Sequence, residues 1–420
     1  MMARNQEHIS RDRLDHLCLL VTDGTHDSPK LQPSGVPFIK GKHISSGFVD
    51  FDNCDYITLE DHEKAIQRSK PEYGDILFSN IGSVGDTAYI NTRNEFSIKN
   101  VALFKPNPRV VDSKYLYYVA IGPKFKVELF AKRSGVAQQF FSLEMLRGHE
   151  VEYHRDLNTQ RKIAAILSAY DDLIENNVRR IKILEEMAQN LYREWFVKFR
   201  FPGHQHARFN DSPLGRIPEG WEVKALDQVA LFQNKGTDAG EHLSDRVYLP
   251  IDCIPRRSLA ISEINSWKEA QSSLHLFDEG DILFGAMRPY FHKVVVAPFK
   301  GVTRKTCFVF KSVLPEYHAF TALTLFQDST ISFANAHSKG ATIPYAVWPQ
   351  SMDGMPVVVP SIEQANRFED AVGPMIARIG TMFFQNTTLH RTRDLLLPRL
   401  ISGEVDVSEL DIAVPVEAVR

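Results

Sequence analysis

The sequence has few cysteines and no long apolar run. Its four cysteines (Cys18, Cys54, Cys253 and Cys307) show no C-x-x-C spacing, which argues against a zinc site or a disulfide framework and suits a reducing compartment. No apolar stretch approaches the roughly 18 residues that a membrane-spanning helix needs. The N-terminal stretch MMARNQEHISRDRLDHL is polar and lacks the apolar core of a signal peptide. We therefore expect a cytoplasmic protein without a membrane segment.

Motifs of common catalytic sites are also missing. The chain has no G-x-x-x-x-G-K-[ST], H-E-x-x-H, G-x-S-x-G or strand-following G-x-G-x-x-G, which disfavours a phosphate loop, a zinc protease, a serine hydrolase and a dinucleotide site. The Asn- or Asp-Pro-Pro-aromatic tetrapeptide of adenine methyltransferases is absent as well. Asp23, His26 and Asp27 could form a catalytic cluster, but a turn-forming loop with an outward-facing histidine explains them better. We expect no catalytic residue and no metal ligand on this chain.

What the chain does contain is an internal repeat. The pentapeptide GDILF occurs at 74–78 and at 280–284, which are 206 positions apart (280 − 74). Each copy is followed by a turn-rich loop, a strand pattern, a basic loop (containing Lys99, or Arg304 and Lys305) and a further strand pattern. RSGVAQQFFSLEML (133–146) matches SKGATIPYAVW (338–348) at nearly the same offset. This self-similarity predicts two copies of one mixed α/β domain.

Each copy is followed by a long helical pattern. Apolar residues recur every three or four positions in both, which is the seam of a coiled coil, and each seam contains one asparagine of the kind that specifies register. We expect the two helices to pair antiparallel. The first seam is Ile163, Leu167, Tyr170, Ile174, Asn177, Ile181, Leu184, Ala188, Leu191 and Trp195, and the second is Phe368, Val372, Met375, Ile379, Met382, Asn386, Leu389, Arg393, Leu396 and Leu400.

Positive charge is concentrated locally. The net charge is −3, so nucleic-acid binding has to rest on local patches. The segment 282–315 has no acidic residue and interleaves aromatic side chains with six cations: Arg288, Lys293, Lys300, Arg304, Lys305 and Lys311. A weaker block in the first half contains Lys114, Lys124, Lys126, Lys132 and Arg133 against Glu128. We interpret the two blocks as equivalent footprints for DNA phosphates; chance charge on solvated loops is the alternative.

The central stretch carries a specific family resemblance. LNTQRKIAAILSAYDDLIENNVRRIKILEEMAQNLYREWFVKFRFPGH (157–204) resembles the central region of type I restriction–modification specificity (S) subunits. LGRIPEGWEV (214–223), DGTHDSPK (23–30) and the terminal LLLPRLISGEV (395–405) are similar to other parts of that family. The chain departs from the pattern at its beginning, which lacks the proline-glycine-tryptophan found before the second copy. The opening strand of the first domain is therefore expected to be arranged differently.

The resemblance implies an α+β fold with two target-recognition domains separated by two long antiparallel helices. The expected segments are 1–156 (first recognition domain), 157–198 (central coiled-coil helix), 199–214 (linker), 215–359 (second recognition domain), 360–402 (C-terminal coiled-coil helix) and 403–420 (tail). Each recognition domain is expected to read one half of a bipartite site in double-stranded DNA. The helices are expected to set the spacing and to dock two methyltransferase (M) subunits, with restriction (R) subunits completing the complex. S-adenosylmethionine, ATP and Mg²⁺ are expected only on those partners.

Residue type and position suggest which side chains contact DNA. Arg and Lys pair with guanine in the major groove, and Gln and Asn pair with adenine, so Arg288 and the Gln138–Gln139 pair are the best candidate readers. The other expected contacts are His26, Lys40, Lys42, Asn80, Lys99, Arg133, Arg256, Arg257, Tyr290, His292, Lys293, Arg304 and Lys339. Asn177 and Asn386 are expected to fix the helix register.

Two other interpretations are compatible with the residues. A specificity-subunit-like scaffold could act outside restriction, as a regulator or a decoy, and a neighbouring gene for an M subunit would argue against it. A solitary DNA-modifying enzyme is the second alternative, and the missing catalytic motifs count against it. Neither the DNA sequence that is read nor the spacer length follows from the sequence.

Overall fold

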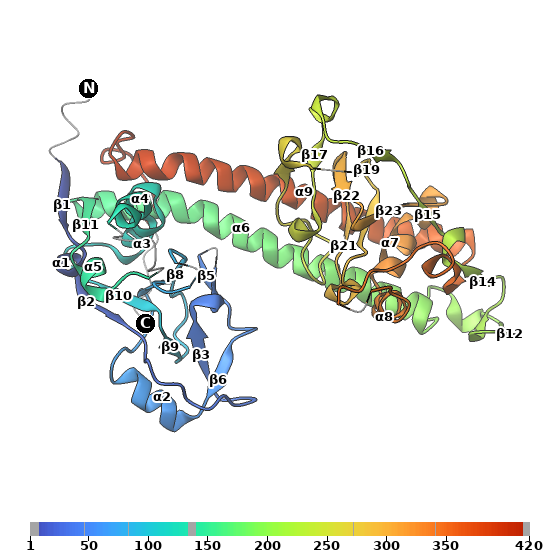
Figure 1. Cartoon of the computed structure of the whole chain (residues 1–420), viewed down its shortest axis with the longest axis horizontal. Helices are drawn as coiled ribbons and strands as arrows, with labels where there is room; N and C mark the ends of the chain where they lie inside the picture. Colours follow the sequence, from blue (N-terminus) through green and yellow to red (C-terminus); the bar gives the residue numbers. More distant parts are fainter. Residues whose placement is uncertain are drawn as a thin grey trace. The chain divides into compact units, whose positions relative to one another are not determined.

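The computed structural model describes residues 8–45, 47–82, 84–132, 140–271, 273–340 and 342–414. The chain divides into two compact units: unit 1 is Met1–Leu173 with Leu389–Arg420, and unit 2 is Ile174–Thr388. The two longest helices, α6 (Leu157–Tyr192) and α9 (Ile362–Ile401), each contribute one part to each unit (Figure 1). The expected long helices are therefore present, and each is shared between the units.

Unit 1 contains two main sheets. A four-stranded antiparallel sheet has the order β2-β10-β7-β8, and a three-stranded sheet has the order β6-β3-β9, in which β3 and β9 are parallel. The strands are β1 (Ile9–Arg13), β2 (Cys18–Asp23), β3 (Val36–Lys40), β4 (Ile44–Ser45), β5 (Phe48–Val49), β6 (Asp55–Ile57), β7 (Ile76–Phe78), β8 (Thr87–Tyr89), β9 (Ser97–Lys99), β10 (Ala102–Pro106) and β11 (Glu150–His154). The remaining helices are α1 (Leu14–Leu17), α2 (Leu59–Ile66), α3 (Ser113–Ile121), α4 (Pro123–Ala131) and α5 (Leu143–Arg147).

Unit 2 has the corresponding sheets with more short strands. Its four-stranded sheet is β15-β23-β20-β21, and a five-stranded sheet is β16-β19-β22-β17-β18. The strands are β12 (Phe209–Ser212), β13 (Gly215–Pro218), β14 (Glu222–Ala225), β15 (Ala230–Phe232), β16 (Gly236–Thr237), β17 (Val247–Tyr248), β18 (Asn265–Ser266), β19 (Leu274–Phe277), β20 (Ile282–Gly285), β21 (Val294–Val296), β22 (Gly301–Arg304), β23 (Cys307–Ser312) and β24 (Pro356–Val359). Its helices are α7 (His318–Phe326) and α8 (Asp328–Ala336).

The topology of the two units confirms the predicted repeat. Strands β2-β10-β7-β8 correspond to β15-β23-β20-β21, the parallel pair β3/β9 corresponds to β17/β22, and the consecutive helices α3 and α4 correspond to α7 and α8. The opening strands also correspond, because β1 pairs antiparallel with β11 as β14 pairs with β24. The expectation of a different opening strand in the first domain was therefore wrong: the pairing does not need the proline-glycine-tryptophan sequence.

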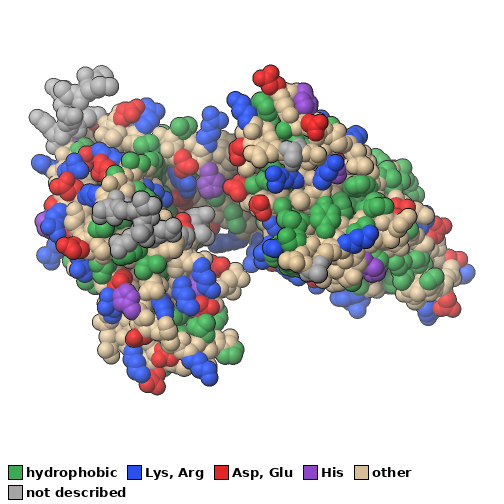
Figure 2. Space-filling view, viewed as in Figure 1, with side chains coloured by type: hydrophobic (Ala, Val, Ile, Leu, Met, Phe, Trp, Pro, Cys, Tyr) green, Lys and Arg blue, Asp and Glu red, His purple; other side chains and the backbone are tan. Residues whose placement is uncertain are grey.

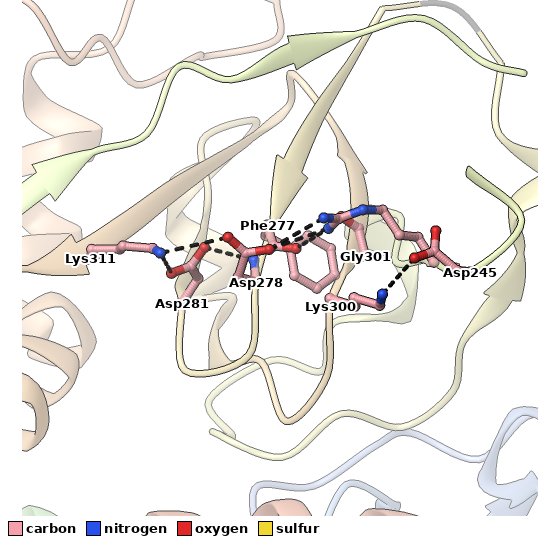
Figure 3. Close-up of polar contacts among 8 residues, drawn as sticks. Asp245, Phe277, Asp278, Asp281, Lys300, Gly301 and Lys311 are labelled. Atoms are coloured by element: carbon pink, nitrogen blue, oxygen red, sulfur yellow. Dashed lines mark hydrogen bonds and ion pairs between the residues drawn. The ribbon is translucent and has the colours of Figure 1, made fainter. Parts of the chain in front are cut away.

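The doubled GDILF forms the same turn in both units. Gly74 and Gly280 have φ of 90° and 83°, which a residue without a Cβ adopts readily. The following Asp75 and Asp281 each accept a hydrogen bond from a backbone N–H three residues earlier, at 2.9 and 2.8 Å. Each aspartate also faces a lysine of the neighbouring strand: Lys105 at 2.6 Å in unit 1, and Lys311 at 3.6 Å in unit 2 (Figure 3).

Desolvation acts on both of these aspartates. Burial raises the pKa of Asp75 and of Asp281, while the facing lysine lowers it in each case. A buried carboxylate requires such a partner. The repeat in sequence is thus a repeat of one buried aspartate that faces a lysine at a tight turn.

Both predicted seams face inward. The seam positions on α6 and α9 are all buried or half-buried. In unit 1 Arg393 Nη1 donates to Asp171, whose other oxygen accepts from Tyr118 Oη at 2.6 Å. In unit 2 Asn177 Nδ2 donates to Asn386 Oδ1 at 2.8 Å, and the Trp195 ring meets the Phe368 ring at 5.5 Å. In unit 2 the partner number falls from 386 to 368 as the residue number rises from 177 to 195, so the helices run antiparallel.

The core of each unit includes the helix ends. In unit 1 Ile163 and Leu167 of α6 and Leu397 and Leu400 of α9 join the buried residues of the four-stranded sheet. In unit 2 a cluster of aromatic side chains joins the ends of both helices to the sheet: Tyr192, Trp195, Phe196, Trp221, Phe320 and Phe368. Burying apolar area of this size is the main favourable contribution to folding. The recognition sheets and the long helices therefore share their cores.

Local signals account for several element boundaries. Thr58, Asp112 and Ser142 accept a backbone N–H at the start of α2, α3 and α5, as expected of N-cap residues. A π-helical turn at Arg193–Val197 follows α6, and Gly403 with φ 72° follows α9. The expected linker 199–214 contains β12, which pairs with β13.

The structure also corrects two expectations about the basic segments. Lys99 and Arg304 were expected in loops, but they are the last residues of β9 and β22, because both segments add a strand to a second sheet. The two basic blocks are not equivalent. The block at 282–315 covers β20 to β23, whose counterparts are β7 to β10. In the first block, Lys114, Lys124 and Lys126 lie on α3 and α4, the counterparts of α7 and α8, Lys132 directly follows α4, and Arg133 lies outside the described residues.

Candidate nucleic-acid interface

Three loops of unit 2 meet around Arg288. The Arg288 N–H donates to Pro344 O at 2.8 Å, and Met287 forms an antiparallel bridge with Tyr345. The Tyr345 hydroxyl donates to Lys305 O in the turn between β22 and β23. These contacts bring together Arg288, the Arg304–Lys305 turn and the 337–345 loop that carries Lys339. All four cations were predicted as part of a DNA-binding surface, and they come from segments up to about fifty residues apart.

Two arginines stack on one aromatic ring beside these loops. The Arg256 guanidinium carbon lies 3.8 Å from the centre of the Phe291 ring, and that of Arg288 lies 5.9 Å from it. The neighbouring Tyr290 is 49% exposed and its ring meets Phe291 edge-on at 4.8 Å. Arg256 and Tyr290 were candidates from the sequence, whereas Phe291 was not. Its position among cations was the available signal, since cations favour the faces of aromatic rings.

The cations of unit 2 differ in whether an acid faces them. Lys300 pairs with Asp245, and Lys311 lies 3.6 Å from Asp278 (Figure 3). Arg257 lies 3.0 Å from Asp328. Within the described ranges, no acidic group pairs with the following cations: Arg256, Arg288, Arg304, Lys305 and Lys339. Lys and Arg side chains lie next to apolar surface on the face of unit 2 in Figure 2. Arg288, Arg304 and Lys305 are therefore the part of the acid-free block that is available to phosphates or bases, and Arg256 and Lys339 add two such cations from outside the block.

His292 and Lys293 point into unit 2. His292 is 3% exposed, and its Nε2 donates to Phe326 O at 2.8 Å. Burial, with the nearby Arg257, lowers the pKa of His292, so the ring is neutral near pH 7. Lys293 is half-buried and its Nζ donates to Ile251 O at 2.7 Å. We therefore do not include either residue among the proposed DNA contacts, because both side chains already form hydrogen bonds within unit 2.

The candidate residues of unit 1 gather at a second place. Lys40, Lys42 and Lys99 line one surface hollow together with Gly41, Ile81, Gly82 and Asn100. Lys40 and Lys42 face Asp55 at 2.8 and 3.6 Å, and the hydrogen bond from Lys40 lowers the pKa of that carboxyl. Lys99 Nζ instead donates to the Ser28 hydroxyl. The hollow thus contains one cation, Lys99, that no described acidic residue neutralises.

His26 belongs to a network that supports this hollow. The Asp23 carboxylate is buried and accepts from Arg68 Nε at 3.0 Å. His26 Nε2 is 3.2 Å from the same carboxylate, and its Nδ1 donates to Asn100 Oδ1 at 3.1 Å. The loop therefore positions Asn100 at the edge of the hollow. Asn100 was not predicted, and its φ of 52° is visible only in the fold.

The remaining candidates are placed differently. Asn80 is 4% exposed and its Nδ2 donates to Phe141 O at 3.3 Å, so it supports the strand end and is no longer counted as a DNA contact. Arg133, Gln138 and Gln139 lie outside the described residues. Among the residues that the structure describes, no group of three or more His, Cys, Asp or Glu side chains could hold a metal ion, and no helix is long and apolar enough to span a membrane.

Comparisons with known proteins agree with this arrangement. The family profile described as the type I restriction modification DNA specificity domain matches residues 18–186. The MjaIX specificity subunit of Methanocaldococcus jannaschii is 27% identical over 419 residues, covering 93% of this chain and 92% of its own length. The HindI specificity subunit of Haemophilus influenzae is 23% identical over 433 residues, covering 84% and 91%.

The chain is similar to the family of type I restriction–modification specificity subunits in its profile match and in its relatives. Its fold is that of the family, since the crystal structure of the S subunit from M. genitalium superposes with a TM-score of 0.58 at 14% identity, covering 94% of this chain and 96% of that one. The family profile covers most of unit 1 and the first part of α6, whereas the relatives span both units. The unpaired cations described above therefore lie on a chain that is similar to specificity subunits, which recognise a DNA target.

Proposed function

We propose that this chain is the non-catalytic DNA-reading subunit of a type I restriction–modification complex. Unit 1 reads one half of a bipartite site in double-stranded DNA, and unit 2 reads the other. The observation that carries the proposal is the repetition of one fold in two units, each with cations at strand ends or in loops that no described acidic residue neutralises. Two related readers on one chain suit a target made of two short sequences.

The long helices support a second part of the proposal, that they set the spacing and dock two M subunits. Several apolar side chains of α6 and α9 lie outside the seams and are between 46% and 61% exposed: Leu173, Val178, Ile183, Met187, Phe384 and Leu395. Exposed apolar side chains on such helices fit a helical partner surface. Because both units contain part of each helix, the same kind of partner can bind at either unit.

In this proposal the M and R subunits, and not this chain, carry out the chemical reactions. S-adenosylmethionine on the M subunits supplies the methyl group, and ATP and Mg²⁺ serve the R subunits. This assignment is supported by the absence of catalytic motifs from the sequence.

Methylome sequencing of cells with and without this gene tests the proposal. With the M subunit present, we expect methyladenine at a bipartite motif that disappears when the gene is deleted. The purified chain alone should transfer no methyl group from S-adenosylmethionine to DNA. Methyl transfer by the isolated chain would contradict the proposal, and a methylome that does not depend on the gene would favour a scaffold acting outside restriction.

A further inference from the structure

One backbone position has the same unusual conformation in both units but carries different residues. Gly82 follows β7 and Arg288 follows β20, and they are 206 positions apart (288 − 82), the offset of the GDILF repeat. Their φ angles are 82° and 51°. The neighbouring contacts are also repeated, since Ile81 bridges Phe140 as Met287 bridges Tyr345. A left-handed conformation suits glycine and strains a residue with a Cβ, so the arginine occupies a position that the fold favours for glycine.

Neighbouring residues restrain the Arg288 side chain, but the fold does not pair its charge. Its Nε is buried without a hydrogen-bond partner in the structure, and no described acidic residue pairs with its guanidinium. Phe291, which Arg256 also contacts, lies on one side of it. A strained residue that persists with free donors indicates a functional role more than a structural one. The terminal nitrogens of Arg288 can form the parallel pair of hydrogen bonds that guanine accepts at O6 and N7.

Two pairs of lysines occupy equivalent positions and differ in their surroundings. Lys105 and Lys311 are 206 apart, and each faces the aspartate of its GDILF turn. Lys99 and Lys305 are also 206 apart (305 − 99). Lys99 is the last residue of β9, Lys305 directly follows the equivalent strand β22, and no described acidic residue pairs with either. The first pair stabilises the fold. The second pair keeps its charge available at the same place in both units.

The comparison between units separates two kinds of DNA contact. The phosphate backbone is the same in both half-sites, so a residue that contacts it can be the same in both copies, whereas bases differ between half-sites. We infer that Arg288 reads a guanine in the half-site bound by unit 2, and that Lys99 and Lys305 are matched phosphate contacts, one in each unit. This inference rests on the proposed function. It adds which of the cations contact bases and which contact phosphates.

Selection from a random DNA library tests the assignment. The full chain, assembled with its methyltransferase subunits, is compared with Arg288→Gly, Lys305→Gln and Lys99→Gln. For Arg288→Gly we expect loss of preference for guanine at one position of one half-site, by roughly 5- to 150-fold, with the other half unchanged. Because glycine occupies the equivalent position in unit 1, this variant should unfold at no lower temperature than the parent.

The two lysine variants should lower the affinity for DNA without changing the base preference. Each should weaken binding to all sequences equally and reduce the slope of log affinity against log salt by about one. Gln350→Gly is a matched control for backbone strain, since Gln350 is an exposed residue of unit 2 with φ 59°. It should leave the selected motif unchanged.

Several results would overturn the assignment. The first is an Arg288→Gly variant whose affinity falls by the same factor for every DNA sequence. The second is an Arg288→Gly variant that loses base preference in both half-sites. The third is a change of base preference in Lys305→Gln or Lys99→Gln. A parent motif with no guanine in the half-site altered by Arg288→Gly would overturn the guanine assignment alone. If the parent complex selects no sequence at all, the proposed function itself fails.

Discussion

At the scale of single residues, burial determines whether an ionisable side chain of this protein is charged. His149 is an example in unit 1: it is fully buried, its ring meets Phe125 edge-on at 4.6 Å, and its Nδ1 lies 3.4 Å from Lys132 Nζ. Burial, together with Lys132 and Arg11, lowers the pKa of His149 to about 4. The ring is therefore neutral in the folded chain over the whole range in which an exposed histidine titrates.

His149 should make unit 1 less stable in acid. Its pKa is about 6.5 in the unfolded chain and about 4 in the fold, so the unfolded state binds an extra proton between these values. The contribution of the neutral ring is complete above about pH 6.5 and is lost as the pH falls towards 4, by about 2 kcal/mol at pH 5. We expect His149→Gln to remove about that much of the stability difference between pH 7 and pH 5, measured by urea unfolding followed by circular dichroism.

A control separates this effect from acid unfolding in general. The parent chain and His149→Gln are unfolded side by side at both pH values, so that acid unfolding that does not involve His149 is common to the two. If His149→Gln loses as much stability between pH 7 and pH 5 as the parent does, His149 is not the group responsible.

At the scale of elements, the apolar seam of each long helix contributes one asparagine to a hydrogen-bonded pair. Asn177 is buried and its side-chain amide donates across to Asn386. A polar pair in an apolar seam reduces stability but favours one register over others. The two asparagines therefore suit helices whose alignment has to be the same in every molecule.

Replacing the asparagines one at a time and together should show strong coupling. Asn177→Leu or Asn386→Leu alone leaves one amide facing an apolar side chain, which lowers the stability of unit 2 by about 1–2 kcal/mol. The double variant should regain most of that loss, because two leucines pack in the seam. Tryptophan fluorescence in urea measures this in unit 2, which contains all four tryptophans.

Asn176→Leu is the matched control for this experiment. Asn176 is the exposed neighbour of Asn177 on α6, and its replacement should change the free energy of unfolding by less than about 0.5 kcal/mol. Additive losses in the double variant would show that the two amides do not depend on each other.

At the scale of the whole molecule, helix length should relate to the length of the gap between half-sites. α6 has 36 residues and α9 has 40, and each begins in one unit and ends in the other. Four residues inserted after Asn177 add about 6 Å and rotate the following part by only about 40°, which a coiled coil can absorb. We expect the unspecified gap to lengthen by one or two base pairs at about 3.4 Å each, with both half-sites unchanged.

Methylome sequencing of cells that carry the insertion provides the measurement. Insertions of two or three residues serve as controls, since they turn the apolar stripe away from its partner and should abolish assembly. An active complex with an unchanged gap would mean that the helices dock partners without setting the spacing.

The sequence by itself determined the features that depend on local patterns. The GDILF repeat, the two seams and the family resemblance are all readable from neighbouring residues, because strand alternation and helix periodicity are local properties. The duplicated α+β fold and the inward-facing seams followed from them. The same reasoning missed the strands that end at Lys99 and Arg304, since those strands are stabilised by partners far along the chain.

Only the tertiary structure decided which cations are available to DNA. Lys300 is neutralised by Asp245, 55 positions away, and Lys311 faces Asp281, 30 positions away, so an acid-free stretch of sequence is not an acid-free surface. His292 and Asn80 are buried by packing that no local pattern records. The contact of Arg256 with Phe291 and the bond from His26 to Asn100 also join distant segments. Charge partners and burial depend on long-range contacts, which the chain acquires only when it folds.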